Sequence, residues 1–199
     1  LLGMLSVRPE LKVCKVAAKY QEEEQAFIKS LEKLAPQLEF IACDTVLEEA
    51  IRDSDIIVTA TSAQAPLLKA EWIKEGAFYS HIGGWEDEYD VVLKADKIVC
   101  DDWETVKHRT QTVSRCYKER LIKDEDIYAN VVDILAERKA GRQSEKEFVY
   151  FNAVGIAYTD IAIAAAMYEK ALKKEVGKKM TLQNEMIFEQ KGLAEKVKF

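Results

Sequence analysis

The chain has 199 residues, a net charge of −6 and 48% apolar residues. This length suits one or two domains, and the composition is that of a globular protein rather than a disordered one. The acidic balance argues against nucleic-acid binding, and no apolar run approaches the roughly 20 residues of a membrane helix. The four cysteines form no CxxC pair. We therefore expect reduced thiols, no metal site, and a cytoplasmic protein with no membrane or nucleic-acid partner.

Up to residue 102, predicted strands alternate with predicted helices. Residues 1–7 are typical of the end of a helix, and an apolar stripe predicts a helix from Gln21 to Leu34. Asp44 or Thr45 could cap the next helix, and Glu48 has the capping-box spacing from Thr45. Alternating or continuous apolar runs predict strands at residues 11–16, 38–43, 55–59, 77–82 and 97–100. This alternation predicts a parallel α/β sheet with right-handed crossovers.

After residue 102 the pattern becomes mainly helical. Residues 105–121 and 127–138 are typical of helices, and residues 147–151 of a last strand. Residues 155–172 form a predicted helix that is apolar nearly all round, which indicates burial or packing against a partner. The tail from Thr181 is amphipathic and ends in lysines.

Three segments follow predicted strands, where open parallel sheets bind ligands. They are Thr59–Ser62, Ser80–Glu88 and Asn152–Gly155. The second combines a glycine pair, which permits close backbone approach, with carboxylates that could act as a general base or grip a substrate ammonium group. Each segment also has a plain structural interpretation, respectively a polar turn, a loop of solvated acids and a strand-to-helix turn.

Other common signatures of chemistry are missing from the sequence. His108 lies in a basic run and is interpreted as a surface residue. No spacing supports a Ser/His/Asp or Cys/His arrangement. The sequence has no GxGxxG, the fingerprint of a dinucleotide-binding turn. Its absence either argues against such a fold or places that turn upstream of Leu1.

Several short runs carry a family resemblance when taken together and in order. They are Ser54–Thr61 (SDIIVTAT), Glu71–Gly76 (EWIKEG), Ile98–Asp102 (IVCDD), Gly141–Arg142 and Gly155–Asp160 (GIAYTD). As a set they resemble the ornithine cyclodeaminase/μ-crystallin family, over nearly the whole chain up to about Lys179.

The resemblance implies a Rossmann-like, doubly wound parallel sheet that lacks its first strand and is followed by C-terminal helices. In this family an N-terminal segment and the C-terminal helix together form a substrate-binding and dimerisation domain. We therefore expect an incomplete NAD(P)-binding domain at residues 1–151, and at 152–199 helices that pack on that absent domain. With strand order 3-2-1-4-5-6, the strands at 12–16 and 56–59 would face each other across a gap. The chain alone would then be poorly stable or inactive.

The resemblance also implies a bound cofactor, NAD or alternatively NADP. Lys19 stands where family members commonly carry an acidic residue for the ribose, which would favour the 2′-phosphate of NADP. The remaining cofactor-binding residues implied by position are Thr59, Ala60, Thr61 and Ser62 beside the cofactor, and Ile82, Gly83, Val154 and Gly155 near the nicotinamide.

The catalytic aspartate of the family follows the glycine pair and precedes a Pro-Gly-Lys-like segment. Here Trp85 occupies that place, Glu86 and Asp87 come next, and the Pro-Gly-Lys segment is missing. We expect Glu86 or Asp87 to replace the aspartate as the proton-handling group. The departure argues against ornithine cyclisation itself.

The function implied is that of an NAD(P)-dependent enzyme that converts an amino acid, as ornithine cyclodeaminase forms proline and ammonia through hydride transfer and an imine. The alternatives are a ketimine reductase or amino-acid dehydrogenase of the same family, a non-catalytic fragment or binding protein, and an unrelated α/β binding domain. The expected partners are a small amino-acid or cyclic-imine substrate and, in the full-length form, a second copy in a homodimer.

Overall fold

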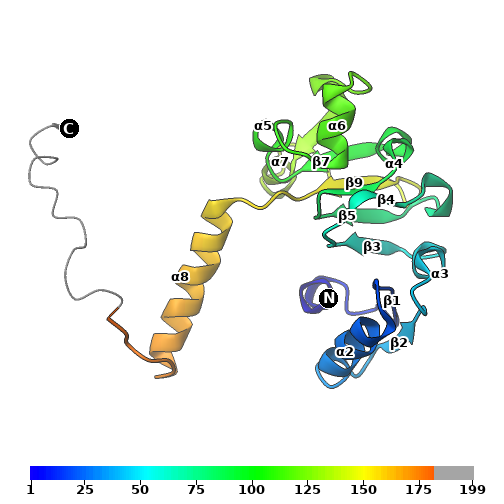
Figure 1. Cartoon of the computed structure of the whole chain (residues 1–199). Helices are drawn as coiled ribbons and strands as arrows, with labels where there is room; N and C mark the ends of the chain where they lie inside the picture. The colour runs from blue at the N-terminus through cyan, green and yellow to red at the C-terminus, as the bar shows by residue number, and fades with distance from the viewer. Residues whose placement is uncertain (182–199) are drawn as a thin grey trace, which may run out of the picture. The chain divides into compact units, whose positions relative to one another are not determined.

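Five parallel strands form the main sheet, in the order β3-β5-β9-β7-β8. Among these, β9 comes last in the sequence, yet it lies between β5 and β7 (Figure 1). Because every pairing is parallel, the carboxyl ends of the five strands meet at one edge. The strands are β3 (Ile56–Thr59), β5 (Phe78–His81), β7 (Lys97–Cys100), β8 (Ile127–Asn130) and β9 (Val149–Asn152).

Two further strand pairs lie outside this sheet. β1 (Val13–Val16) pairs with β2 (Glu39–Ala42), and β4 (Gln64–Leu68) pairs with β6 (Trp85–Asp87), both in parallel. The computed structural model describes residues 1–181, and within them no ladder joins β1 to β3. This agrees with the predicted gap. The sheet departs from a simple 3-2-1-4-5-6 order because β9 is inserted between β5 and β7.

Helices, most of them short, connect and flank the strands. The glutamates Glu22–Glu24 begin α2, where the helix dipole favours acidic side chains. The helices are α1 (Leu2–Val7), α2 (Gln21–Leu31), α3 (Leu47–Ile51), η1 (Ala70–Trp72), α4 (Tyr89–Lys94), α5 (Trp103–Val106), α6 (Thr112–Lys118), η2 (Asp124–Asp126), α7 (Val131–Leu135) and α8 (Ala157–Lys173).

The core of the main sheet lies at β5, β9 and β7. All four residues of β7 are buried, as its continuous apolar run predicts for a strand covered on both faces. Tyr79 of β5 and Tyr150 of β9 have no exposed surface, and their ring centroids lie 5.2 Å apart in an edge-to-face pair. Such pairs contribute about 0.5–1.5 kcal/mol beyond burial. This packed centre holds the carboxyl ends of β5 and β9 in place.

The predicted capping box at Thr45 was wrong. Helix α3 begins at Leu47, its N-cap residue is Val46, and no side chain caps it. Thr45 has a φ of 66°, whereas an N-cap residue needs an extended backbone. Its backbone N–H instead donates to Glu24 Oε1 at 2.8 Å. A contact with α2 therefore overrides the local capping signal.

The helices predicted over 105–121 and 127–138 were partly wrong. The first is divided into α5 and α6 by an extended Gln111, and the Ser114 hydroxyl donates to Val106 O at 2.6 Å across the break. In the second, Ile127–Asn130 forms strand β8 because it pairs with β7 at the edge of the sheet, and only Val131–Leu135 is helical.

Contacts divide the chain into two compact units, Leu1–Ile156 and Ala157–Phe199. The predicted domain boundary after residue 151 stays a prediction. In the second unit, α8 forms as predicted and buries none of its residues. The amphipathic pattern predicted for the tail lies, beyond Thr181, outside the described residues. Within residues 1–181, no helix is long and apolar enough to cross a membrane.

Candidate functional site

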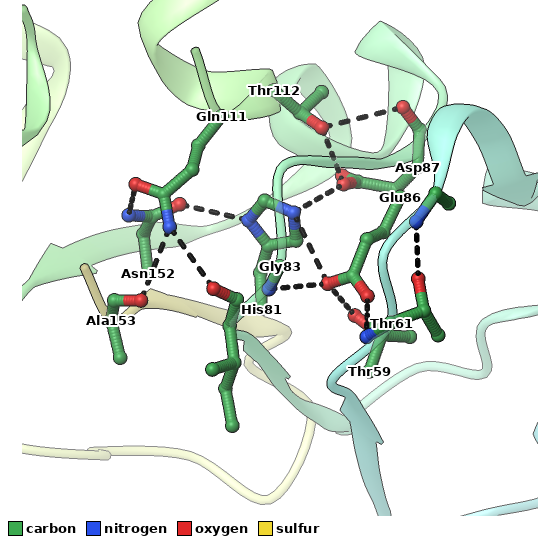
Figure 2. Close-up of polar contacts among 12 residues, drawn as sticks. Thr59, Thr61, His81, Gly83, Glu86, Asp87, Gln111, Thr112, Asn152 and Ala153 are labelled. Carbon is green, nitrogen blue, oxygen red and sulfur yellow. Dashed lines mark hydrogen bonds and ion pairs between the residues drawn. The ribbon is translucent and has the colours of Figure 1, made fainter. Parts of the chain in front are cut away.

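Strand β6 carries two carboxylates into the interior of the first unit. Glu86 and Asp87 have no exposed surface, so the interpretation of this segment as a loop of solvated acids is wrong. The burial arises because β6 pairs with β4 and packs beside α6. The two carboxylates lie beneath the carboxyl ends of β3, β5 and β9 and share one hydrogen-bonded network with them (Figure 2).

Glu86 joins the loop after β3 to the loop after β5. Its carboxylate accepts hydrogen bonds from the Thr59 hydroxyl and the Gly83 N–H, both at 2.7 Å, and from the Thr61 N–H at 2.5 Å. Burial raises the pKa of this carboxyl, but the hydrogen bonds outweigh burial and hold the pKa below its usual value. Glu86 is therefore an ionised clamp between two strand ends.

Asp87 is in the opposite electrostatic situation. Burial raises its pKa to about 6, although His81 and the hydrogen bonds from Thr112 and Tyr150 act against the rise. Its Oδ1 accepts from the Thr112 hydroxyl at 2.6 Å and from the Tyr150 hydroxyl at 3.4 Å. Its Oδ2 is buried without a hydrogen-bond partner. Adjacent carboxyls in one strand thus have pKa values moved in opposite directions, a feature typical of sites that handle protons.

His81 lies between these carboxylates at the end of β5. Its Nε2 is 3.5 Å from Glu86 Oε2 and 3.5 Å from Asp87 Oδ1, and the side chain has no exposed surface. Its Nδ1 lies 2.9 Å from Asn152 Oδ1, at the end of β9. His81 therefore links the carboxylates of β6 to the neighbouring strand of the main sheet.

Gln111 and Asn152 connect the ends of β5 and β9. The Gln111 amide nitrogen lies 3.3 Å from Ile82 O and 3.1 Å from Ala153 O, and donates to both. Asn152 Nδ2 donates to Gln111 Oε1 at 2.9 Å. Both amide side chains are buried. One glutamine at the start of α6 thus holds the two segments that were predicted to lie near a nicotinamide.

Asp101, which follows β7, binds the turn after β9. Its Oδ2 accepts the backbone N–H groups of Val154 and Gly155, each at 2.8 Å. Gly155 has a φ of +82°, a conformation that disfavours other residues, and a Cβ placed there would meet no atom of the described residues within 4 Å. The turn after β9 is therefore tied down on one side and open on the other.

Comparison with known proteins gives this arrangement a family. The model of the ornithine cyclodeaminase/mu-crystallin family matches residues 4–175. The chain belongs to this family. An alanine dehydrogenase from Archaeoglobus fulgidus is 39% identical over 137 residues, which make up 67% of this chain and 42% of that protein. The chain spans about half the length of such curated family members.

Solved structures of family members agree in fold. The Thermococcus litoralis Δ1-pyrroline-2-carboxylate reductase in complex with NADH and L-proline has a TM-score of 0.79 and 29% identity, over 85% of this chain and 53% of that one. An archaeal alanine dehydrogenase dimer with bound NAD has a TM-score of 0.77 and 32% identity, over 92% and 56%. The predicted Rossmann-like α/β class and the family resemblance are confirmed.

The structure brings most of the predicted cofactor residues to one edge. Thr59, Thr61 and Gly83 meet at Glu86, and Ile82 reaches the turn after β9 through Gln111. Ala60 and Ser62 are exposed in the loop after β3, and Val154 and Gly155 share Asp101. Lys19 is exposed and follows β1, which pairs with β2 outside the main sheet. Its Nζ lies 5.1 Å from the Tyr20 ring centroid. It takes no part in this network.

This edge fits the nicotinamide half of a dinucleotide. Ile82 is 45% exposed and offers an apolar contact, and Thr61 and Ser62 are exposed residues with hydroxyl groups. Glu86 and Asp101 already occupy the backbone N–H groups of Thr61, Gly83, Val154 and Gly155. Hydroxyls, carbonyls and apolar surface remain, which suit a ring and a ribose better than phosphates. Since the sequence has no GxGxxG, no phosphate contact is assigned to this chain.

Sequence reasoning missed part of the network. Gln111 and Thr112 were not singled out, and His81, Asp101 and Asn152 were noted only as members of longer segments. For His81, Asp101 and Asn152 the signal is a polar residue at the end of a strand, whereas Gln111 and Thr112 begin α6 and have no such local signal. Trp85, which was expected at the family's aspartate position, is half-buried, and the Arg115 guanidinium carbon lies 4.4 Å from its ring centroid. Within the described residues, no three metal-ligating side chains gather.

Proposed function

We propose that the protein to which this chain belongs catalyses NAD-dependent interconversion of an amino acid and its imine. The observation that supports this is the edge at which β3, β5 and β9 end, where Glu86, Gln111 and Asp101 hold the three loops predicted to contact the cofactor. When bound there, the nicotinamide supplies hydride transfer. The protein's own contribution is orientation and charge.

Different residues of this chain contact the cofactor and handle the proton. Ile82 and the hydroxyls of Thr61 and Ser62 contact the ring and its ribose, and Gly155 leaves room at the turn after β9. Of the two carboxyls expected to handle a proton, Asp87 takes that role and Glu86 stays ionised beside it. Because neither Glu86 nor Asp87 has exposed surface, both act through hydrogen bonds to other groups rather than by contact with the substrate. The half-buried Thr59 hydroxyl, which donates to Glu86, connects that carboxylate to the end of β3. Lys19 beside the ribose would favour NADP, whereas the solved relatives bind NAD or NADH.

Net oxidation or reduction is favoured over ornithine cyclisation. Relatives at 39% and 32% identity are alanine dehydrogenases, and one at 29% is a cyclic-imine reductase. Trp85 also occupies the family's aspartate position. Its indole packs under Arg115 and has no carboxylate with which to act on a substrate amine.

The test is a substrate panel with the full-length protein. Alanine, proline, ornithine and Δ1-pyrroline-2-carboxylate are each incubated with NAD or NADH, while cofactor absorbance and ammonia are both followed. A dehydrogenase or reductase changes the cofactor in step with the substrate. Ammonia release from ornithine without net cofactor change would instead establish cyclisation. Absence of cofactor binding would overturn the proposal in favour of a binding protein.

A further inference from the structure

The orientation of the Gln111 amide follows from its surroundings. Its nitrogen lies 3.3 Å from Ile82 O and 3.1 Å from Ala153 O. A carbonyl oxygen can only accept a hydrogen bond, so an amide oxygen facing two of them would be repelled. The nitrogen must therefore face the carbonyls, and Gln111 Oε1 must face away from them.

This orientation determines the two groups that follow in the chain. Gln111 Oε1 lies 2.9 Å from the Asn152 amide, which must present its nitrogen as donor. Asn152 Oδ1 then faces His81 Nδ1 at 2.9 Å and accepts from it. His81 is thus the Nδ1–H tautomer, selected by two backbone carbonyls through two buried amides (Figure 2).

The tautomer decides what His81 presents to the carboxylates. Nε2 is left to face Glu86 Oε2 and Asp87 Oδ1, each 3.5 Å away, and it has no hydrogen-bond partner. A bare nitrogen lone pair facing two buried anionic oxygens is strongly unfavourable. A proton on Nε2 or on Asp87 removes that repulsion. Within residues 1–181, no lysine or arginine forms an ion pair with either carboxylate.

The other side chains packed around His81 are uncharged, so none of them supplies a positive charge in place of this proton. On β5 and β9, the neighbours Tyr79 and Tyr150 have pKa values raised well above the ordinary value by burial, so they remain neutral hydroxyls. From α6, Thr112 donates to Asp87, and burial raises the pKa of the nearby Cys116 thiol to about 12. Within residues 1–181, the charged groups that face His81 are therefore Glu86 and Asp87.

We infer that His81, held as its Nδ1–H tautomer by Asn152 and Gln111, shares one buried proton with Asp87 beneath the strand ends of the proposed cofactor site. Asn152 and Gln111 are positioning residues, because they act through His81 and through the loops that they hold. Glu86 stays ionised and binds the Thr61 and Gly83 N–H groups. With one proton, the three side chains Glu86, Asp87 and His81 carry a single negative charge.

The consequence for the cofactor rests on the proposed function. The nicotinamide ring is positive only when oxidised, so loss of the shared proton adds a negative charge that favours the oxidised form. The affinity for NAD relative to NADH is therefore expected to rise with pH, by roughly threefold to tenfold, as for one charge acting through partly screened protein. In Asp87→Asn this pH dependence is expected to be lost.

The tautomer can be tested without any cofactor. The chain has only two histidines, so His108→Gln leaves His81 as the single ring signal. Nitrogen-15 NMR of the 199-residue chain is expected to show a proton on Nδ1 at every pH at which the chain is folded. The Nε2 signal is expected to differ in Asp87→Asn, because that variant removes the carboxyl with which Nε2 shares the proton. A neutral ring with its proton on Nε2 would overturn the inference.

Two variants at Asn152 separate positioning from general damage. Asn152→Asp keeps an oxygen facing Nδ1 and is expected to retain the Nδ1–H tautomer, whereas Asn152→Leu is expected to lose it. Equal tautomer populations in both would contradict the role of Asn152. If the NMR result holds but neither NAD nor NADH binds the full-length protein, the proposed function fails while the shared proton stands.

Discussion

At the residue scale, two adjacent glycines have different surroundings. A Cβ on Gly83 would lie 2.4 Å from the Glu86 carboxyl carbon and 2.6 Å from Thr61 O, whereas one on Gly84 would meet nothing nearer than 3.6 Å. Gly83→Ala must therefore displace the Glu86 clamp. We expect it to lower the free energy of unfolding in urea by about 1–3 kcal/mol, and Gly84→Ala, the matched control, to have little effect. Equal losses in the two variants would show that the clamp does not depend on this close approach.

Asp87 gives a pH-dependent prediction. Its folded pKa is about 6 and its ordinary value is 3.8, so between these values the folded state holds a proton that the unfolded state has lost. Its contribution to stability is therefore fully present below pH 3.8 and decreases as the pH rises to about 6. Asp87→Asn should lack this decrease. Urea titrations of the two proteins from pH 4 to 7 measure the difference, and parallel curves would contradict it.

At the scale of elements, local patterns predicted the structures that depend on local chemistry. The continuous apolar run at Lys97–Cys100 became β7, and the stripe from Gln21 became α2. The structure of Ile127–Asn130 does not follow from its local sequence, because this segment becomes a strand by pairing with β7. Strands β4 and β6 were missed for the same reason. Each is short and is defined by its pairing with the other.

The candidate site could likewise be predicted only where it depends on local sequence. The loops after β3, β5 and β9 could be located, since ligands bind at the carboxyl ends of parallel strands. The hydrogen bonds that join these loops could not be predicted, because they depend on the insertion of β9 beside β5. That pairing brings Asn152 to His81 across 71 positions of sequence, and it allows Gln111 to bridge both strands. Strand order is a property of the whole sheet that no local pattern contains.

At the scale of the whole molecule, the two units differ in how they bury apolar surface. The described part of the first has two clusters of buried apolar residues, whereas α8 in the second exposes Ile161, Tyr168 and Leu172 by 70%, 65% and 60%. These positions recur at helical spacing and share one face. Burying such a side chain contributes about 1.5–3 kcal/mol, so this face favours association with another apolar surface, which for the isolated chain in solution is a second copy.

We therefore expect the 199-residue chain to self-associate through α8. Sedimentation equilibrium should show a mass that rises with concentration, and the double variant Ile161→Lys/Leu172→Lys should remain a monomer. Thr159→Lys/Glu169→Gln changes the helix charge by the same amount at exposed polar positions and should associate like the parent chain. If both variants dissociate alike, charge repulsion rather than the apolar face controls assembly. If the parent chain is a monomer throughout, α8 needs a different partner, because its apolar face would then have to be covered by something other than a second copy.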